Sequence, residues 1–226
     1  MAGAAAYDEI AEWYDEQVRG GGLLHDLVLP ALFELAGDVA GQQVCDLACG
    51  QGVVARQLAE RGAFVTGVDL SAGLLAIARR EEAARPREIS YLLGDAQRLD
   101  GIGDASFDGV ACNMALMDIP DLGATARTVA RILRPGGWFV FSITHPMLDT
   151  AIGRARLVRA ATGESGNTRS YFAEGPWRAE TGGVRGRVGA HHRTLSTYVN
   201  TLVAAGLALE RLAEPQATGA AAERVP

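Results

Sequence analysis

VCDLACGQG, residues 44–52, has the pattern of a short buried strand that runs into a glycine-rich turn. The turn opens a helix at Val53, so the free N–H groups of the helix start face the turn. Gly50 and Gly52 allow backbone conformations closed to other residues, and they let a ligand approach the main chain closely. The stretch therefore predicts a turn that binds a nucleotide cofactor.

The spacing of the turn alone leaves the cofactor open. Gly50, Gly52 and Ala55 fit the dinucleotide fingerprint, and Asp69 follows at about the twenty residues expected of a ribose-binding acid. Asp46 argues against NAD, because a carboxylate at the strand end would face a pyrophosphate at short range. S-adenosylmethionine (SAM) carries an ammonium and a sulfonium, which an anion favours. In the alternative interpretation, Asp46 only bonds nearby loop N–H groups.

Length and composition limit the class of protein. The 226 residues suffice for one α/β domain with an insertion. The sequence has no apolar run of membrane-spanning length and no signal-peptide pattern. Cys45, Cys49 and Cys112 are odd in number and indicate reduced cytosolic thiols. The net charge of −6 gives no reason to expect a nucleic acid as partner. Together with the thiols and the lack of a spanning run, it leads us to expect a cytoplasmic protein with no membrane partner.

Strands and helices alternate along the middle of the chain. Strands are predicted at 43–47, 63–69, 89–93, 107–112 and 138–143, and helices at 53–61, 72–84 and 122–133. This spacing predicts βαβ units in a mostly parallel sheet, with the ligand at the carboxyl ends where the strand order reverses. Four polar residues fall at successive strand ends: Asp46, Asp69, Asp95 and Asn113.

Two helices are expected before the first strand. Residues 4–18 carry an apolar stripe at helical spacing that includes Tyr7, Trp13 and Tyr14. Such a stripe is usually part of a core, but these aromatic side chains could also form a lid over a ligand. The second helix is expected from 23 to 36, with a kink at Pro30.

The region 146–193 departs from the alternation. It is rich in glycine and holds eight arginines against four acids, which favours a cap over the substrate. We expect its aromatic side chains to line the acceptor pocket, together with one arginine: Tyr171, Phe172, Trp177 and Arg178. The alternative is an ordinary solvated loop. After it, Thr194 is expected to cap a helix at 195–205, and the alternating residues 207–212 to form a sixth strand.

Taken together and in order, five motifs resemble those of the class I SAM-dependent methyltransferases, in the branch that acts on small molecules. They are Asp46–Gly52, Gly67–Ser71, Gly94–Ala96, Phe107–Asp108 and Leu133–Gly137, and the resemblance covers about residues 5–213. It implies an α/β fold with a Rossmann-like, doubly wound and mostly parallel sheet. The chain then divides into an N-terminal helical lid (1–40), a SAM-binding core (41–145), a substrate-cap insertion after strand five (146–193) and a C-terminal helix, strand and tail (194–226).

The resemblance also implies contacts to the methionine end of SAM. Asp46 would hold it together with the turn residues Ala48, Gly50 and Gly52, although the family has a glycine where this chain has Ala48. Two residues after the fourth strand would line the methionine portion: Asn113 and Met114.

For the adenosine end, the resemblance implies that Asp69 takes both ribose hydroxyls. Leu70 would pack on the adenine, and Asp95 with the Ala96 N–H would read its edge. Tyr7 and Tyr14 match a Tyr-Asp pattern that often closes over the cofactor.

Methyl transfer is an in-line displacement on a sulfonium, so a base is needed only when the nucleophile is protonated. The candidates are His145, His191 and His192, which slightly favours oxygen over nitrogen as the acceptor atom. We expect a methyltransferase that acts on a small molecule and releases S-adenosylhomocysteine (SAH), with no metal. The alternatives are an NAD(P)-dependent oxidoreductase, although the chain has no lysine for a catalytic Tyr/Lys pair, and a non-catalytic SAM-binding protein.

The family's sheet usually ends with a seventh, antiparallel strand, and nothing after Pro215 has a strand pattern. A sixth strand at 207–212 would then lie at an exposed sheet edge, which invites pairing. We therefore expect either that part of 165–190 folds back as an extra strand or that a second subunit covers the edge. The protein would accordingly be a monomer or a homodimer.

Overall fold

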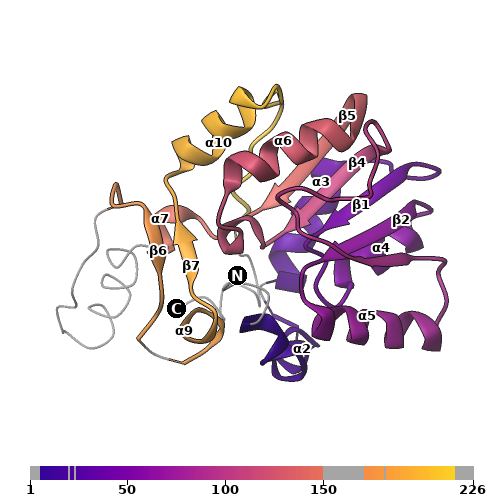
Figure 1. Ribbon diagram of the computed structural model, residues 1–226, viewed down its shortest axis with the longest axis horizontal. Coiled ribbons are helices and arrows are strands. Elements are labelled where there is room, and N and C mark those ends of the chain that lie inside the picture. Colours follow the sequence, from indigo (N-terminus) through magenta and orange to yellow (C-terminus); the bar gives the residue numbers. More distant parts are fainter. Residues whose placement is uncertain (1–5, 20, 23, 150–170, 181, 217–226) are drawn as a thin grey trace.

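A five-stranded sheet forms the centre of the computed structural model, which describes residues 6–19, 21–22, 24–149, 171–180 and 182–216 (Figure 1). Its strands are β1 (Gln43–Leu47), β2 (Phe64–Asp69), β3 (Ser90–Leu93), β4 (Phe107–Asn113) and β5 (Leu133–Ser142). They lie in the order β3-β2-β1-β4-β5, and every neighbouring pair is parallel. The predicted doubly wound sheet is confirmed, and the strand order reverses between β1 and β4.

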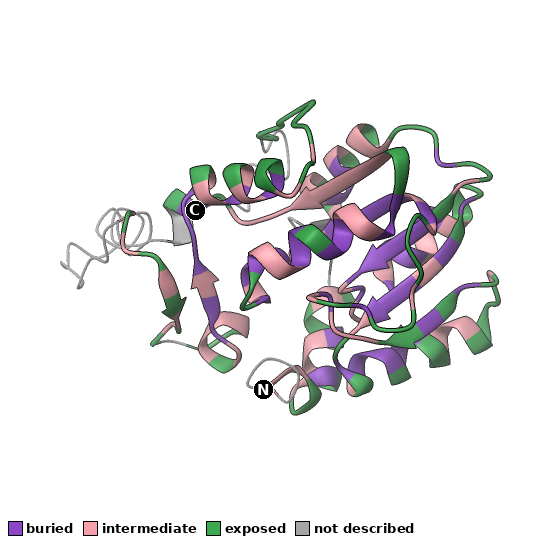
Figure 2. Cartoon of the chain, turned by 45° about the horizontal axis from the view of Figure 1, so that its top comes forward, coloured by how far each residue is buried: buried purple, intermediate pink, exposed green. Residues whose placement is uncertain are grey.

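Helices cover both faces of the sheet. One face packs against α3 (Leu29–Ala36), α4 (Val53–Glu60) and α5 (Ala72–Ala84), and the other against α6 (Leu122–Ile132) and α10 (Leu195–Ala204). Alternate residues of β1 serve the two cores, since Val44 packs on the first side and Cys45 and Leu47 on the second. Strands β1 and β4 are therefore buried on both faces, as Figure 2 shows.

Side-chain caps fix the starts of three helices. Ser71 accepts a hydrogen bond from the Leu74 N–H at 3.1 Å and begins α5. Asp121 begins α6 in the same way, and Thr194 begins α10, as its sequence predicts. Each cap satisfies a helix-terminal N–H that would otherwise lack a partner.

The N-terminal helices differ in detail from the prediction. Residues 6–8 form a helical turn, and α2 (Ala11–Arg19) follows it; residues 1–5 lie outside the described part. A short π-helix, η1 (Leu24–Val28), precedes α3, and Pro30 lies in the first turn of α3. The expected kink at Pro30 is therefore wrong, because a proline in the first turn breaks no helical hydrogen bond.

Strand β5 begins at Leu133, earlier than the predicted 138–143, and therefore includes residues 134–137. Phe107 of β4 pairs with Leu133 of β5, and Gly109 pairs with Trp138. Residues 134–137 of β5 therefore lie opposite a single residue of β4 and form a bulge. The bulge places the Trp138 ring over Gly109, where a Cβ atom would collide with it. The Trp138 indole N–H also donates to Gln42 Oε1 at 2.8 Å.

The described part of the region after β5 forms its own small unit. After α7 (Pro146–Asp149), β6 (Gly175–Trp177) and β7 (Ala190–His192) pair antiparallel, with α9 (Val184–Arg187) between them. Figure 1 shows this two-stranded sheet apart from the central sheet. Among the described residues, the expectation that part of 165–190 extends the central sheet is therefore wrong; residues 150–170 lie outside them.

Residues 207–212 are not a strand, contrary to the prediction. Leu207 packs into the core beside α10, whereas Leu209 and Leu212 are 55% and 58% exposed. Two exposed side-chain contacts lie along the irregular segment: Arg211 with Glu34 at 3.1 Å, and Glu214 with His145 at 3.2 Å. Residues 207–212 pair with no described strand, so β5 is the last strand of the sheet on this side.

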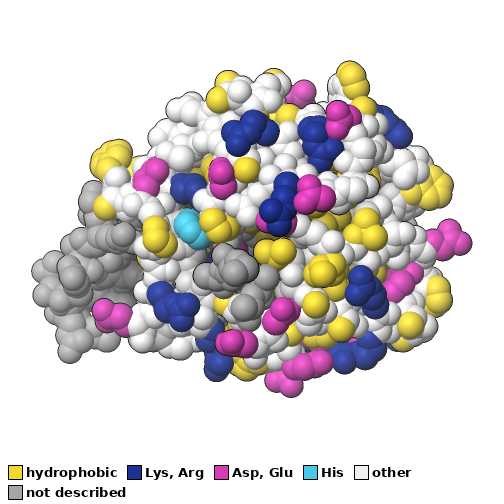
Figure 3. All heavy atoms as spheres, viewed as in Figure 1, with side chains coloured by type: hydrophobic (Ala, Val, Ile, Leu, Met, Phe, Trp, Pro, Cys, Tyr) yellow, Lys and Arg dark blue, Asp and Glu magenta, His cyan; other side chains and the backbone are white. Residues whose placement is uncertain are grey.

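Acidic and basic side chains are mixed over the face of the molecule drawn in Figure 3. Within the described residues, every helix is too short or too polar to span a membrane.

Candidate cofactor site

The glycine-rich turn follows β1 at the point where the strand order reverses. Three of its residues have positive φ angles: Ala48 at 56°, Gly50 at 54° and Gly52 at 81°. The Gly52 N–H donates to the Cys49 carbonyl at 2.9 Å, and a Cβ atom at Gly52 would collide with the Tyr91 hydroxyl. The turn therefore needs glycine at position 52 for both its conformation and the space beside it.

Asp69, at the end of β2, lies directly beside this turn. Its Oδ2 atom accepts from the Gly50 N–H at 2.7 Å, and its Oδ1 atom accepts from the Ser71 N–H at 2.8 Å. Burial raises the pKa of Asp69, and the surrounding N–H groups oppose that rise. The carboxylate expected to bind ribose hydroxyls is thus fixed against the turn.

Asp46, at the end of β1, is almost completely buried. Burial raises its pKa to about 8, and the Ala55 N–H in the first turn of α4 opposes the rise. The contact with Ala55 agrees with the alternative interpretation, in which Asp46 bonds nearby N–H groups. Its Oδ2 atom, however, makes no hydrogen bond to any other described residue. A free, buried acceptor fits an ammonium donor and does not fit a pyrophosphate.

The loop after β3 holds the residues expected near adenine. Asp95 Oδ1 accepts from the backbone N–H and the side-chain amide of Gln97, both at 2.9 Å, so the loop orients this carboxylate. Ala96 is buried, whereas Leu70 is 43% exposed. An exposed leucine after β2 leaves an apolar surface on which an adenine ring can pack.

The end of β4 is tied to the end of β5. Ser142 donates its hydroxyl to Asn113 Oδ1 at 2.7 Å, and the Met114 N–H contacts both the Ser142 carbonyl and its Oγ atom at 3.0 Å. Met114 has a φ of 53°, which is strained for a residue with a side chain. The sequence prediction missed Ser142, although its place at the end of the fifth strand was a usable signal.

The N-terminal segment contacts both sides of this site. The rings of Tyr7 and Tyr14 meet edge to face with centroids 5.3 Å apart, and the Tyr7 hydroxyl donates to Asp118 Oδ2 at 3.0 Å. Burial, with nearby Asp118 and Asp69, raises the pKa of Tyr14 to about 12. Asp8 accepts from the Ser71 hydroxyl at 2.5 Å and from the Gly73 N–H at 2.9 Å. The prediction did not name Asp8, although it belongs to the Tyr-Asp pair.

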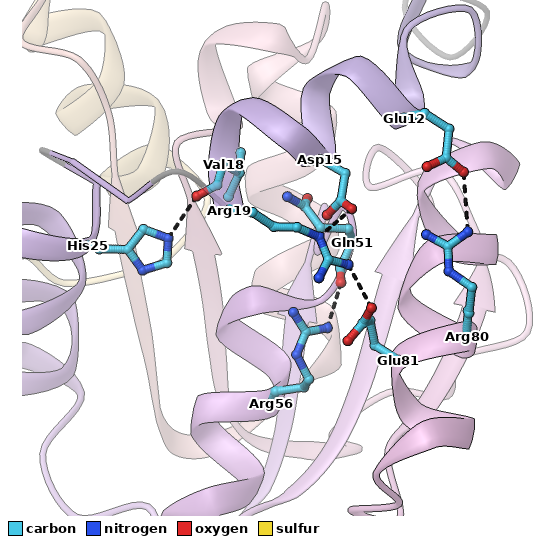
Figure 4. A network of polar contacts seen from close by, with 9 residues as sticks. All are labelled: Glu12, Asp15, Val18, Arg19, His25, Gln51, Arg56, Arg80 and Glu81. Carbon is cyan, nitrogen blue, oxygen red and sulfur yellow. Dashed lines mark hydrogen bonds and ion pairs between the residues drawn. The ribbon is translucent and has the colours of Figure 1, made fainter.

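A polar network anchors α2 beside the turn (Figure 4). Arg19 pairs with Asp15 and with Glu81 of α5, both at 2.6 Å. Arg56 of α4 donates to the carbonyl of the buried Gln51 at 2.7 Å. Arg19 therefore ties the N-terminal helix to α5, and Arg56 ties α4 to the turn residue Gln51.

The three candidate histidines lie in different places. His145 is exposed, with Nδ1 near the Met147 N–H at 3.2 Å and Nε2 near Glu214. His192 is buried, with Nε2 at 2.8 Å from the Tyr171 carbonyl. His191 lies against the loop after β4, where its ring bonds the backbone of Met117. Burial and then Arg193 lower the pKa of His191, which favours its neutral form.

The residues expected to line the acceptor pocket do not form one wall. The Tyr171 hydroxyl accepts from the Leu195 N–H at 2.9 Å, and Phe172 is 82% exposed. Trp177 is half-buried in β6, and Arg178 is exposed. Two other residues of this region contact the loop after β4 and were missed: Arg185, which pairs with Asp118, and Arg193. Their partners are distant in sequence, so no local pattern pointed to them.

The doubly wound parallel sheet has acidic side chains around the glycine-rich turn, at the point where the strand order reverses. These features define a Rossmann-like cofactor-binding domain, and comparisons with known proteins agree. Residues 45–141 match the family model of the methyltransferase domain. The chain is 34% identical to the S-adenosylmethionine dependent methyltransferase from Mesorhizobium loti, with 85% of this chain and 84% of that chain covered and a TM-score of 0.65. The chain therefore belongs to the SAM-dependent methyltransferase family, whose cofactor is SAM.

Two further comparisons are more limited. A SAM-dependent methyltransferase from Methanosarcina mazei is 21% identical, with 76% of this chain and 82% of that chain covered and a TM-score of 0.57, and it shows the shared fold alone. The ubiquinone biosynthesis O-methyltransferase of Alkalilimnicola ehrlichii is 32% identical over 141 residues, which are 61% of this chain and 57% of that protein. The chain thus matches little more than half the length of this curated relative.

Proposed function

We propose that this protein transfers a methyl group from SAM to an oxygen, or to a nitrogen, of a small molecule. The observation that carries the proposal is the cluster at the switch point of the sheet. Asp69 is fixed against the turn by the Gly50 N–H, and the buried Asp46 beside it keeps one free acceptor atom. Together they offer acceptors for two ribose hydroxyls and for an ammonium.

The contribution of the chain to the reaction is mainly alignment. When bound, SAM supplies a methyl group on a sulfonium, which is a good leaving group. Asp46 and the turn residues would hold the methionine end, Asp69 the ribose, and Leu70, Asp95 and Ala96 the adenine. Asn113 and the strained Met114 would border the methyl-donating end, under Tyr7 and Tyr14. Fixing two reactants in line can be worth about 7–11 kcal/mol, and the covered site also excludes water.

For the base we propose His191, in preference to His145 and His192. Two observations support it: its contact with the Met117 backbone beside the ends of the strands, and its lowered pKa. A neutral imidazole can accept a proton at neutral pH. By contrast, both ring nitrogens of His145 have partners, Met147 and Glu214, and His192 is almost completely buried beside Tyr171, whereas His191 is only half-buried. A base is required for a hydroxyl acceptor, so the proposal favours oxygen.

The acceptor itself is proposed only as a class. The O-methyltransferase named above matches 141 residues, 61% of this chain and 57% of that protein, so its acceptor is not carried over to this chain. The described part of the 146–193 region, with β7 packed against η2 (Leu116–Asp118), is proposed to cover the acceptor. Tyr171, Trp177 and Arg178 belong to this cover, whereas Phe172 points largely to solvent. A cytoplasmic monomer or homodimer, with neither nucleic acid nor membrane as partner, completes the proposal.

Calorimetry with SAH and NADH tests the cofactor assignment. The wild type is expected to bind SAH, and Asp69→Ala to weaken binding at least tenfold, since hydrogen bonds to a charged group contribute about 1.5–3 kcal/mol each. Asp100→Ala is the control, because Asp100 is an exposed acid paired with Arg98. Equal affinity in Asp69→Ala, or tight binding of NADH, would refute the assignment. SAH binding without methyl transfer to any phenol or amine would indicate a binding protein.

The pH profile of methyl transfer tests the base. With His191 as base, the wild-type rate should fall as the pH drops through the lowered pKa of this histidine, because the imidazole then becomes protonated. His191→Gln should lower turnover and lose this acidic limb, with SAH affinity nearly unchanged. His192→Gln and His145→Gln serve as comparisons. If all three variants keep wild-type rates from pH 6 to 9, the reaction runs by alignment alone, and an amine becomes the better acceptor.

A further inference from the structure

Asp118 joins three parts of the chain that meet over the carboxyl ends of the strands. It belongs to η2, in the loop that follows β4. One of its oxygens, Oδ2, accepts from the Tyr7 hydroxyl at 3.0 Å, and the other, Oδ1, pairs with Arg185 of α9. Arg185 also donates to the Gly189 carbonyl at 3.1 Å, which fixes its guanidinium group. The Asp118 and Arg185 side chains are 18% and 15% exposed, so the solvent screens their pairing weakly.

A second contact joins the same two outer parts. The guanidinium of Arg187, also in α9, lies over the ring of Trp13 in α2, 4.3 Å from its centroid. Figure 1 shows α9 next to α2, below the two-stranded sheet. The N-terminal segment and the turn at 184–189 are therefore linked in two ways: through Asp118, which bonds both Tyr7 and Arg185, and through the cation–π contact between Trp13 and Arg187.

Tyr7 connects Asp118 with the side of the site that is expected to bind the cofactor. Tyr7 packs edge to face on Tyr14, whose pKa is raised in part by Asp118 and Asp69, so Tyr14 lies near both acids. Next to Tyr7, Asp8 binds the Ser71 hydroxyl and the Gly73 N–H. The N-terminal segment is thus attached on the ribose side by Asp8 and on the opposite side by Tyr7. Only the second attachment involves the 184–189 turn.

We propose that Asp118 is a positioning residue: by bonding Tyr7 and Arg185 together it holds the N-terminal segment closed, and it thereby sets how long the bound cofactor is retained. This inference rests on the proposed function. On this proposal the N-terminal segment opens readily in the free protein and closes over the cofactor after it has bound, whereas release requires the Tyr7–Asp118 bond to open again. Weakening the junction should therefore act on the dissociation rate of SAH far more than on its association rate.

The test is stopped-flow measurement of SAH association and dissociation. Asp118→Asn keeps the shape of the side chain but removes its charge, so we expect dissociation about tenfold faster with association little changed. Tyr7→Phe removes a single hydroxyl and should accelerate dissociation about threefold or more. Because Tyr7 and Asp118 act through one shared contact, the Tyr7→Phe/Asp118→Asn double variant should dissociate less fast than the product of the two single effects predicts. Asp118→Glu, which keeps the charge, should restore part of the retention.

Asp108→Asn is the matched control, because Asp108 also joins an arginine and a second donor. It pairs with Arg134 at 2.5 Å and accepts from the Gln43 N–H at 2.8 Å, at the amino ends of the strands. Its SAH dissociation rate should equal that of the wild type. If wild-type protein binds SAH but Tyr7→Phe and Asp118→Asn both dissociate at the wild-type rate, the role of Asp118 is overturned. If the wild type does not bind SAH at all, the proposed function fails instead. Should Asp118→Asn fold poorly, Tyr7→Phe alone decides the outcome.

Discussion

Ala48 has a left-handed backbone at a position where the family has glycine, with a φ of 56°. A Cβ atom in this conformation costs about 1–2 kcal/mol, whereas glycine loses about 0.5–1 kcal/mol of conformational freedom on folding. Ala48→Gly should therefore raise the free energy of unfolding by about 0.5–1 kcal/mol in urea denaturation. The control is Ala55→Gly inside α4, which should lower it by about 1 kcal/mol. Destabilisation by Ala48→Gly would show that the turn carries no strain.

Asp46 predicts a pH dependence of cofactor binding. Burial raises its pKa to about 8 in the free protein, so much of it is protonated at pH 7. An ammonium beside the free Oδ2 atom favours the ionised form, and binding should therefore release up to one proton. SAH affinity should then rise with pH until about pH 8 and level off above it.

Calorimetry of SAH binding at pH 7 in phosphate and in Tris measures this release, because the two buffers take up protons with different enthalpies. Asp46→Asn should remove the buffer dependence, and Asp95→Asn should keep it. Equal binding enthalpies in the two buffers for the wild type would contradict the prediction.

The residues that could be predicted from sequence are those whose role is tied to a strand end. Four polar residues each follow a recognisable apolar run, and all four lie at the carboxyl ends of the strands: Asp46, Asp69, Asp95 and Asn113. The partners of Tyr7 could not be predicted in this way. Asp118 is 111 residues from Tyr7, and only the packing of the whole chain brings the two together.

At the scale of the elements, Arg193 fixes the loop after β4. It is 8% exposed, and its guanidinium donates to three backbone carbonyls, those of Leu116, Ile119 and Pro120, at 2.7–3.0 Å. The planar fork of arginine can serve all three carbonyls, which an ammonium group cannot do in the same geometry. Arg193 therefore holds η2, the element that carries Asp118.

Arg193→Met should cost about 3 kcal/mol or more in the free energy of unfolding, because buried carbonyls lose their donors. Arg193→Lys should recover only part of this loss. Arg131 is a matched control, since it also donates to carbonyls, those of Ile102 and Arg98, but its side chain is 33% exposed. Arg131→Met should cost about 1 kcal/mol. Equal losses for the two methionine variants in urea denaturation would argue against a special role for Arg193.

Element bounds were predictable where the signals are local. The predicted helix 72–84 agrees with α5 at both ends, because Ser71 caps its start and Pro86 stops its continuation. The bulge in β5 and the irregular residues 207–212 were not predictable. The first depends on the Trp138 ring over Gly109, and the second on whether another strand lies alongside.

For the whole molecule, the alternation of strands and helices was enough to predict a parallel doubly wound sheet. The position of the site followed from the reversal between β1 and β4. The contacts that close the site could not be predicted from the sequence. The N-terminal segment and α9 are far apart in the chain and meet through a few polar and aromatic contacts.

The distance in sequence between Tyr7, Asp118 and Arg185 has a consequence for synthesis of the protein on the ribosome. Tyr7 and Trp13 are made among the first residues, but α9 follows only after about 170 more. At a synthesis rate of roughly 5–20 residues per second, α9 is made on the order of ten seconds or more after Trp13 of α2. The sheet can form in that interval, since β5 ends at Ser142. On the proposed role of Asp118, chains elongated past α9 retain SAH longer than shorter translation products do.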